Sequence, residues 1–515
     1  MLKLNLVVFL FLISLTSLRA QVTTEGKDFW FGFMQNADGG SSSSNMSTLE
    51  IFITSNEPAS GQITNYTDGA VVNFTIVPGA TFKHVLSVAN NNPYAASGSG
   101  NAQSKGIHVT SDVDISVYAF NRRRFSADAS VILPTNSLGN KYYASGYYET
   151  YTDGYYPGYY SELLVVATTD DTEIEITPSV DTENGFDAGQ TYSVTLNAGD
   201  IYQLQAVYDL TGTLITASTN ANDCKNFAVF SGHQFTRVNG GQNCDYSTTN
   251  NNGAITNYSD GFAADHLYEQ MYPVNTWGKD YIALPFFGRT GYVLQITAAE
   301  DATKIEINGL TVTLNAGRKI RGARSGITNI KSDKPIQVAQ ISQSMSCDFP
   351  IGTVDLRGPG DPFMIMLSPN EQFLNEVTFN ALESPQITDY TVTVFVKTGD
   401  IDQLTLEGTA VDPDEFITVR TVPEYAYANL KIEKGNDYTL KSESGFIAYI
   451  YGFGDVESFG YVAGVSLENL NLIIEGNDEQ IGILAENGCI NSEITFDAIF
   501  DTPTGEVPRY DTFRW

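Results

Sequence analysis

The feature that most constrains the fold of this chain is a short pattern that returns four times along it. A glycine, two polar residues and an aromatic residue occur in that order at Gly26–Phe29, Gly139–Tyr142 and Gly278–Tyr281, and a weaker copy occurs at Leu374–Val377. Solenoid repeats are about 20–50 residues long, and this spacing is larger. It is closer to the length of a β-sandwich domain, which is about 100 residues. The pattern therefore predicts four related domains.

The segments between these openers have the pattern of β-strands. Apolar and polar residues alternate, or β-branched and aromatic residues dominate, in stretches such as Leu49–Thr54 and Thr172–Thr177. The string LNAG occurs at Leu196–Gly199 and Leu314–Gly317, where glycine allows the positive φ of a tight hairpin. The short stretch Asp265–Met271 is the one candidate for a helix. We predict an all-β fold of tandem β-sandwich-like units with internal repeats.

The first residues have the composition of a secretory signal peptide. Lys3 precedes the mostly apolar run Leu4–Leu18, and the small residue Ala20 ends the segment before the expected cleavage site. No later run has the roughly 18 consecutive apolar residues of a transmembrane helix. We therefore expect an exported protein, located outside the cell or at the cell surface.

These patterns together give a predicted domain organisation. The residues after 468 resemble the opening half of a PKD-type or immunoglobulin-like repeat that stops at Trp515, so we interpret the chain as a fragment or as one with a degenerate end. The predicted segments are a signal peptide (1–20), four β-sandwich units (21–133, 134–272, 273–368 and 369–468) and an incomplete PKD-like or immunoglobulin-like segment (469–515).

The chain is strongly acidic. Its 515 residues include 28 basic and 60 acidic ones, which gives a formal net charge of −32. Nucleic acids and anionic membrane surfaces are bound through clustered Lys and Arg, so neither is an expected partner. Hydrophobic residues make up 42% of the chain, which is enough to build packed cores.

The sequence contains four cysteines, and an oxidising compartment would allow them to form disulfides. Cys224 and Cys244 are close in sequence and are the candidate pair, although other connectivities stay open. Cys347 and Cys489 would then pair with each other or remain buried thiols. Because the chain has no CxxC and its four histidines are scattered, a zinc site is not expected.

A tyrosine-rich segment, residues 142–160, is the main candidate for a contact surface. It holds nine tyrosines among Gly, Asp and Pro residues. Tyrosine offers a large amphipathic surface at low entropic cost, which is why binding loops favour it. The alternative is that these side chains cover a sandwich edge. The predicted ligand contacts are Tyr151, Tyr155, Tyr156, Tyr159 and Tyr160.

Two kinds of charged cluster have weaker functional interpretations. The basic run 122–124 could contact an acidic glycan, but pairing with internal acids is favoured. Acidic turns at 112–114, 170–171 and 412–415 could begin a Ca²⁺ site, although Asp also suits such turns because it bonds the local backbone. We therefore expect no cofactor, with Ca²⁺ as a weak possibility.

The sequence contains little that indicates catalysis. Ser231 and His233 lie in one strand-like segment, and Asp265 and His266 lie in another, so a Ser–His–Asp arrangement can be drawn. However, no G-x-S-x-G nucleophile elbow is present. Nothing singles out a carboxylate pair of the kind that hydrolyses glycosides. We predict that the protein is not an enzyme.

Four long strings together resemble one protein family. They are DLTGTLITAS (209–218), FAVFSGH (227–233), DHLYEQMYPVNTWGKDY (265–281) and GDPFMIMLSPNEQF (360–373). They are similar to the N-terminal domain of the IgG Fc-binding protein family, in its bacterial-type secreted form. The family runs Cys-Asp-His-Leu without a break, whereas here Cys244 is separated from Asp265 by a polar stretch. The resemblance implies an extracellular, non-enzymatic role in binding or adhesion.

The predicted function is therefore that of a secreted or cell-surface binding or adhesion protein. Its expected partner is an extracellular glycoprotein or glycan, recognised by loops, with no insertion into a membrane and no prediction of oligomeric state. Two alternatives stay open. The protein could be a secreted carbohydrate-active enzyme, which requires a cleft with two carboxylates, or a passive structural stalk without a specific ligand.

Overall fold

The protein is built almost wholly from antiparallel strands, which confirms the predicted all-β fold class. The computed structural model describes residues 22–37, 46–89, 92–123, 125–148, 158–218, 225–242, 244, 246–249, 255–258, 263–345, 347–348, 360–470, 473–477 and 480–484. Within these ranges the helical segments are short 3₁₀ turns: η1(Thr135–Ser137), η2(Val274–Thr276), η3(Thr398–Gln403) and η4(Pro413–Glu415).

Four successive groups of strands each form two sheets, and the first sheet has the same strand order in every group. We call it the opener sheet, because its first strand lies at a copy of the repeated opener. The four opener sheets are β1(Gly26–Phe31)–β7(Ile107–Arg123)–β3(Ala59–Asn65)–β4(Val71–Ile76), β9(Lys141–Tyr143)–β14(Leu214–Ala217)–β11(Thr172–Thr177)–β12(Tyr192–Leu196), β19(Asp280–Ala283)–β24(Thr328–Ser332)–β21(Thr303–Ile307)–β22(Leu310–Leu314) and β27(Leu374–Asn380)–β33(Asp437–Gly454)–β29(Thr405–Leu406)–β30(Thr409–Ala410).

The second sheet of each group also repeats its strand order, and we call it the axial sheet. The long strands β7 and β33 serve both sheets, the first half in one and the second half in the other. The four axial sheets are β8(Ser126–Ile132)–β7–β2(Met46–Thr54)–β5(Phe82–Ala89), β18(Asp265–Gln270)–β15(Phe227–Thr236)–β10(Ser161–Ala167)–β13(Asp200–Ala206), β26(Met364–Met366)–β25(Ile336–Ile341)–β20(Tyr292–Ala298)–β23(Lys319–Arg324) and β34(Glu457–Gly464)–β33–β28(Ile387–Lys397)–β32(Tyr425–Lys431).

A few short strands lie outside this scheme. β6(Ala102–Ser104) extends the second axial sheet, and β31(Ile417–Thr418) extends the fourth. Two separate hairpins are β16(Tyr246–Thr249) with β17(Ile255–Tyr258), and β35(Ile473–Asn477) with β36(Gln480–Leu484). The pairing of β6 with β13 crosses the expected boundary at 133/134, so neighbouring groups share a sheet. The exact domain boundaries stay a prediction.

Strand alternation explains why each group folds as stacked layers. Along β11 and β21 every second residue is buried, so each strand presents one apolar face to the core. Gly199 and Gly317, the last residues of the two LNAG strings, have φ of 82° and 67°, as predicted for hairpin glycines. The stretch Asp265–Met271 is not helical, and the expectation of a helix there is wrong because its residues pair with β15 as strand β18.

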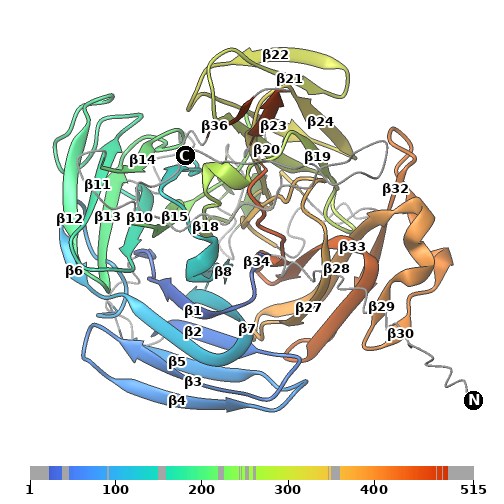
Figure 1. Ribbon diagram of the computed structural model, residues 1–515, viewed down its shortest axis with the longest axis horizontal. Helices are drawn as coiled ribbons and strands as arrows, with labels where there is room; N and C mark the ends of the chain where they lie inside the picture. Colours follow the sequence, from blue (N-terminus) through green and yellow to red (C-terminus); the bar gives the residue numbers. More distant parts are fainter. Residues whose placement is uncertain are drawn as a thin grey trace, which may run out of the picture.

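The four groups form a closed ring. The innermost strands of the axial sheets contact one another in a cycle, β8 with β18, β18 with β26, β26 with β34 and β34 with β8. Figure 1 shows the four groups around this centre, from blue through green and yellow to orange. The ring is closed by the first described residues, because Thr23 bridges Ser466 and the Thr24 N–H donates to the Val465 carbonyl at 3.1 Å.

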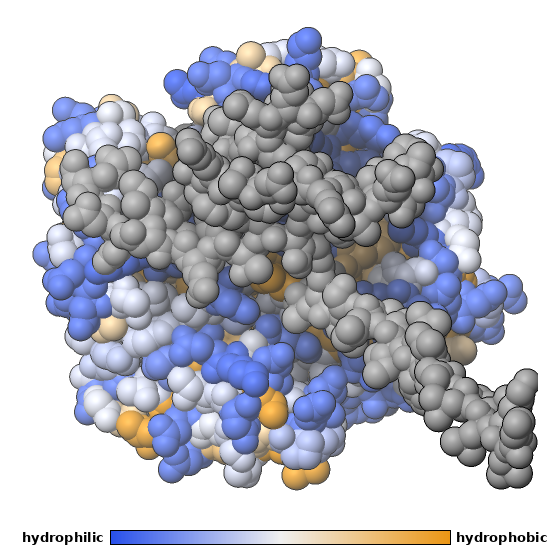
Figure 2. Space-filling view, in the orientation of Figure 1, coloured by the Kyte–Doolittle hydropathy of each residue, from blue (hydrophilic) through white to orange (hydrophobic). Residues whose placement is uncertain are grey.

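The described surface is mostly hydrophilic on the face that Figure 2 shows. The hydrophobic residues are scattered singly or in small groups over this face. No helix in the described ranges has the length and apolarity needed to cross a bilayer.

Candidate functional site

The predicted tyrosine contacts fall partly outside the described residues. Tyr151, Tyr155 and Tyr156 lie there. Tyr159 and Tyr160 are half-buried at the start of β10. The Tyr159 ring packs edge-on against Phe235, with centroids 5.3 Å apart, and the Tyr160 carbonyl accepts the Gln234 N–H at 2.9 Å. One end of the tyrosine-rich segment is therefore fixed to strand β15.

The other end of the segment supports the alternative interpretation, in which tyrosines cover the fold. Tyr142 is fully buried, and its hydroxyl donates to the Phe227 carbonyl at 2.9 Å. The Arg321 guanidinium lies over the buried Tyr147 ring, 4.1 Å from its centroid. Arg321 also donates to the Tyr148 carbonyl at 2.9 Å. These tyrosines are therefore fixed to the fold at this end of the segment.

An ion cluster lies beside these tyrosines. The Asp209 carboxylate accepts from Arg321 at 2.8 Å and also bonds Lys319. Burial alone would raise the pKa of Asp209, but the two cations outweigh it and hold the pKa below its usual value. These ion pairs join Asp209 in the second group of strands to Lys319 and Arg321 in the third.

Within the basic run at 122–124, Arg122 is paired internally, which agrees with the favoured interpretation. Arg122 forms an ion pair with the buried Glu50 at 3.1 Å, and Lys83 contacts the same carboxylate at 3.0 Å. Arg123 is buried, and Arg124 lies outside the described residues. The described part of this cluster therefore serves the packing of β2, β5 and β7.

The acidic clusters bond backbone N–H groups, but the partner is local in sequence only for Asp412, and Asp112 lies within strand β7 rather than in a turn. Asp112 accepts the Ser60 N–H at 2.8 Å, Asp170 accepts the Ala198 N–H at 3.1 Å, and Asp412 accepts the Asp414 N–H at 3.0 Å. Among the residues that the structure describes, no group of three or more His, Cys, Asp or Glu side chains has an arrangement suited to a metal ion.

The predicted disulfide partner of Cys244 is wrong. Cys244 is bonded to Cys347, with Cα atoms 4.9 Å apart across 103 residues of sequence. Cys224 lies outside the described residues. Proximity in sequence was a poor guide because the ring brings the segments after β15 and β25 together, as the Val238 carbonyl and the Ser344 N–H, 2.9 Å apart, also show. The disulfide links the second and third groups of strands.

The Ser, His and Asp residues considered for catalysis are buried in the neighbouring strands β15 and β18. His266 donates from Nδ1 to the His233 carbonyl at 3.0 Å, and its Nε2 accepts from Asn121 at 3.1 Å. His233 accepts the Phe235 N–H at Nδ1. Burial lowers the pKa of His233 to about 3 and that of His266 to about 4, so both rings are neutral. The His266 nitrogens link β18 to β15 and β7, whereas the His233 Nδ1 bonds backbone within its own strand.

The centre of the ring is organised by Asp128, which the sequence did not single out. This carboxylate is fully buried on β8 and accepts N–H groups from the other three inner strands. Its Oδ2 accepts from Tyr268 on β18 at 3.1 Å and from Met364 on β26 at 3.2 Å, and Gly460 on β34 donates to the same group. One side chain thus ties all four groups of strands together.

Three further buried acids surround one end of the centre. Asp265 begins β18, Glu457 begins β34, and Asp361 lies just before β26. The Asp265 and Asp361 carboxyl groups are within hydrogen-bonding reach of each other, and their Oδ2 atoms have no donor among the described residues. A proton on one of the two carboxyl groups would let it donate to the other. Burial raises the pKa of Asp361 to about 7.

The sequence held only a faint indication that Asp265, Asp361 and Glu457 belong together. The acids occupy the same place in the second, third and fourth copies of the repeat, whereas the first copy has Ser126. Their enclosure excludes a large substrate, so the arrangement can hold a proton and join strands.

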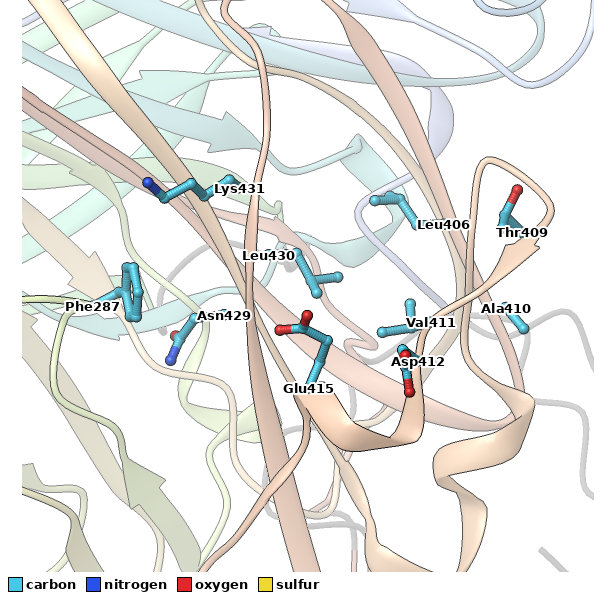
Figure 3. A pocket seen from close by; sticks show the side chains of 10 residues that line it. All are labelled: Phe287, Leu406, Thr409, Ala410, Val411, Asp412, Glu415, Asn429, Leu430 and Lys431. Carbon is cyan, nitrogen blue, oxygen red and sulfur yellow. The ribbon is translucent and has the colours of Figure 1, made fainter.

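A groove on the outer part of the fourth group is open to solvent. It has a volume of about 570 Å³ and is lined by the β29–β30 hairpin, η4, β32 and Phe287 from the third group. Figure 3 shows Phe287, Asn429 and Glu415 around this hollow. The Phe287 side chain is 46% exposed. Of these residues, Asp412 and Glu415 belong to the acidic turn 412–415 noted in the sequence, whereas no pattern pointed to Phe287 or Asn429, which come from other segments.

The fold and these sites define a closed ring of sandwich-like units with a packed acidic centre and open outer loops. A family model described as IgGFc binding protein matches residues 128–452, and the chain belongs to this family. A human protein named IgGFc-binding protein is 24% identical over 446 residues, which is 85% of this chain and 7% of the human protein. The family prediction is confirmed, while the bacterial type and the PKD-like repeat stay predictions.

Proposed function

We propose that this protein is secreted or displayed at the cell surface, where it binds an extracellular glycoprotein or glycan without catalysing a reaction. The observation that carries the proposal is membership of the IgGFc binding protein family over residues 128–452. The human relative is named for binding the Fc part of IgG, which is itself an extracellular protein. The signal-like N-terminal residues and the disulfide support an extracellular location.

The geometry supports binding by loops rather than chemistry at the centre. Asp128, Asp265, Asp361 and Glu457 are enclosed, and each is engaged in joining strands. A carbohydrate-active enzyme would need two carboxylates facing a substrate in a cleft. The tyrosine-rich segment between Tyr148 and Tyr159, fixed at both ends, remains the proposed contact surface.

An array of extracellular glycoproteins and free glycans tests the proposal. The purified chain should bind a subset of the array, and the triple variant Tyr151→Ser, Tyr155→Ser, Tyr156→Ser should bind glycoproteins at least about tenfold more weakly, because tyrosines dominate such interfaces. Tyr94→Ser, which changes a half-buried tyrosine elsewhere, is the matched control. A folded chain that binds nothing would favour the stalk, and cleavage of an arrayed glycan would favour the enzyme.

A further inference from the structure

Phe287 is held in an outward position by a rigid base. Its neighbour Phe286 is buried in an aromatic cluster, with its ring centroid 4.8 Å from that of Phe363 and 5.1 Å from that of Tyr451. Close by in the chain, Arg289 is buried and ion-paired with Asp348 at 2.8 Å. A large apolar ring with 46% exposure on such a fixed loop is a flat platform facing the groove.

A one-directional hydrogen-bond relay runs from this loop to Asn429. The Phe287 N–H donates to the Tyr451 hydroxyl at 2.9 Å. The Tyr451 and Thr393 hydroxyls are 2.7 Å apart, and Thr393 donates to the Asn429 Oδ1 at 2.7 Å. Because Tyr451 already accepts the backbone proton, its own proton goes to Thr393, whose proton goes on to Asn429.

The relay fixes the orientation of the Asn429 amide. Tyr451 and Thr393 are buried, whereas Asn429 is half-buried and lines the groove. Since Oδ1 is occupied by Thr393, the Nδ2 group is the part of the amide left to donate toward the groove. Buried hydroxyls that hold a polar side chain in one rotamer are typical of a prepared binding site.

The remaining groove side chains supply both donors and acceptors. Lys431 is exposed at one side, and Asp412 and Glu415 are exposed on the turn opposite (Figure 3). Asp412 uses Oδ1 to accept the Asp414 N–H, which leaves Oδ2 for a ligand. Two carboxylates against one ammonium disfavour an anionic ligand.

We infer that this groove binds a short neutral glycan. The apolar face of a sugar ring fits against Phe287, while its hydroxyls accept from Asn429 and Lys431 and donate to Glu415 and Asp412. The volume of about 570 Å³ lies within the range of small-ligand sites, and it suits a short oligosaccharide. The inference rests on the proposed function and gives the glycan a place apart from the tyrosine-rich segment.

The test uses the full chain on an array of neutral oligosaccharides beside their sialylated and sulfated counterparts. The wild type should bind neutral glycans, and the strongest neutral glycan then serves as the titrant in calorimetry. Phe287→Ala and Asn429→Asp should each weaken its binding roughly tenfold, through loss of the platform and of the amide donors. Leu310→Ala, which removes an exposed apolar side chain on β22, should leave the affinity unchanged.

Thr393 is a positioning residue, and its test separates position from packing. Thr393→Val keeps the shape but removes the hydroxyl that holds Asn429, so the affinity for the same glycan should fall several-fold, about as much as for one lost hydrogen bond. Thr393→Ser restores the hydroxyl and should recover the affinity. A merely structural role predicts instead that both variants change the melting temperature and neither changes binding by the folded protein.

The outcomes distinguish this inference from the proposed function. Neutral-glycan binding that is unchanged in Phe287→Ala and Asn429→Asp overturns the groove site and leaves the proposed function intact. The same holds if the chain binds only glycoproteins without their glycans, or only anionic glycans. A folded chain that binds nothing on either array overturns both.

Discussion

At the residue scale, the buried acids at the ring centre join strands of different groups. Asp361 faces Asp265 on β18, Glu457 on β34 and the Arg289 guanidinium, and its Oδ1 accepts the Ser458 hydroxyl at 2.7 Å. Desolvation dominates, so the pKa of Asp361 rises to about 7. A carboxyl group that keeps its proton when folded and loses it when unfolded makes stability depend on pH.

Asp361→Asn should abolish part of that dependence. Between the unfolded pKa near 4 and the folded value of about 7, the native wild type holds a proton that the unfolded chain has lost, so its unfolding free energy falls as pH rises. From pH 5 to pH 8 this loss amounts to about 3 kcal/mol. The asparagine amide donates permanently to Asp265, so the variant should lack the loss. Urea unfolding at both pH values measures the difference.

The control for this comparison is Asp187→Asn, which changes an exposed carboxylate. It should keep the wild-type pH slope. Equal slopes for the wild type and Asp361→Asn would mean that Asp361 is already ionised in the folded protein.

Residue chemistry was only partly predictable from the sequence. His233 was noticed in FAVFSGH, and Asp265 and His266 were noticed in DHLYEQM. The sequence did not reveal what these three side chains do in the fold. No local pattern pointed to Asp128, because its role is to accept N–H groups from three strands that are distant in sequence. The Cys244–Cys347 bond likewise depends on the ring, because it joins residues 103 apart.

At the element scale, the strands that local pattern could identify were those with an alternating face. β11 and β21 follow from period-two alternation and the LNAG hairpins from glycine turns, whereas the opener strands were marked by the repeated opener. Strand β18 was misread because it is buried on all sides, and a short buried run has no period to separate strand from helix. Only its pairing with β15 decides its structure.

Gly232→Ala should detach β18 from β15. Gly232 pairs with Tyr268, and a Cβ at this position would lie 1.8 Å from the Leu267 carbonyl oxygen. The backbone would have to move, so we expect a loss of roughly 3 kcal/mol or more in unfolding free energy. Gly399→Ala, where a Cβ has open space, should be nearly neutral. Chemical denaturation of both variants measures this, and equal stability would show that the pair has room to shift.

At the scale of the whole molecule, the sequence predicted the repeat but not the ring. Four related units with the same two-sheet order follow from the repeated openers. Their closure into a cycle depends on contacts such as Thr24 with Val465, which are 441 residues apart. No local sequence pattern predicts a contact at that separation. The contact forms only when all four groups of strands pack into the closed ring.

Thr24→Val should loosen the closure. The Thr24 Oγ1 accepts the Val465 N–H at 3.2 Å, and both residues are buried. A valine of the same shape leaves that N–H without its acceptor, at a cost of about 1–3 kcal/mol. Hydrogen exchange at the Val465 amide should accelerate at least about tenfold, while exchange at Tyr268, in the ring interior, should change less.

Thr75→Val, on the exposed part of β4, is the matched control and should leave exchange at Val465 unchanged. Exchange at Val465 that is equally slow in Thr24→Val would place the closing contact elsewhere.

The contact between Thr24 and Val465 has a consequence for biosynthesis. A ribosome must deliver β34 and Val465 before Thr24 finds its partner, so an emerging chain spends most of its synthesis as an incomplete arc with uncovered sheet edges. Premature stops would leave that arc permanently open and prone to join other copies. A target that recognises only the closed ring would therefore bind only chains whose translation has passed Val465.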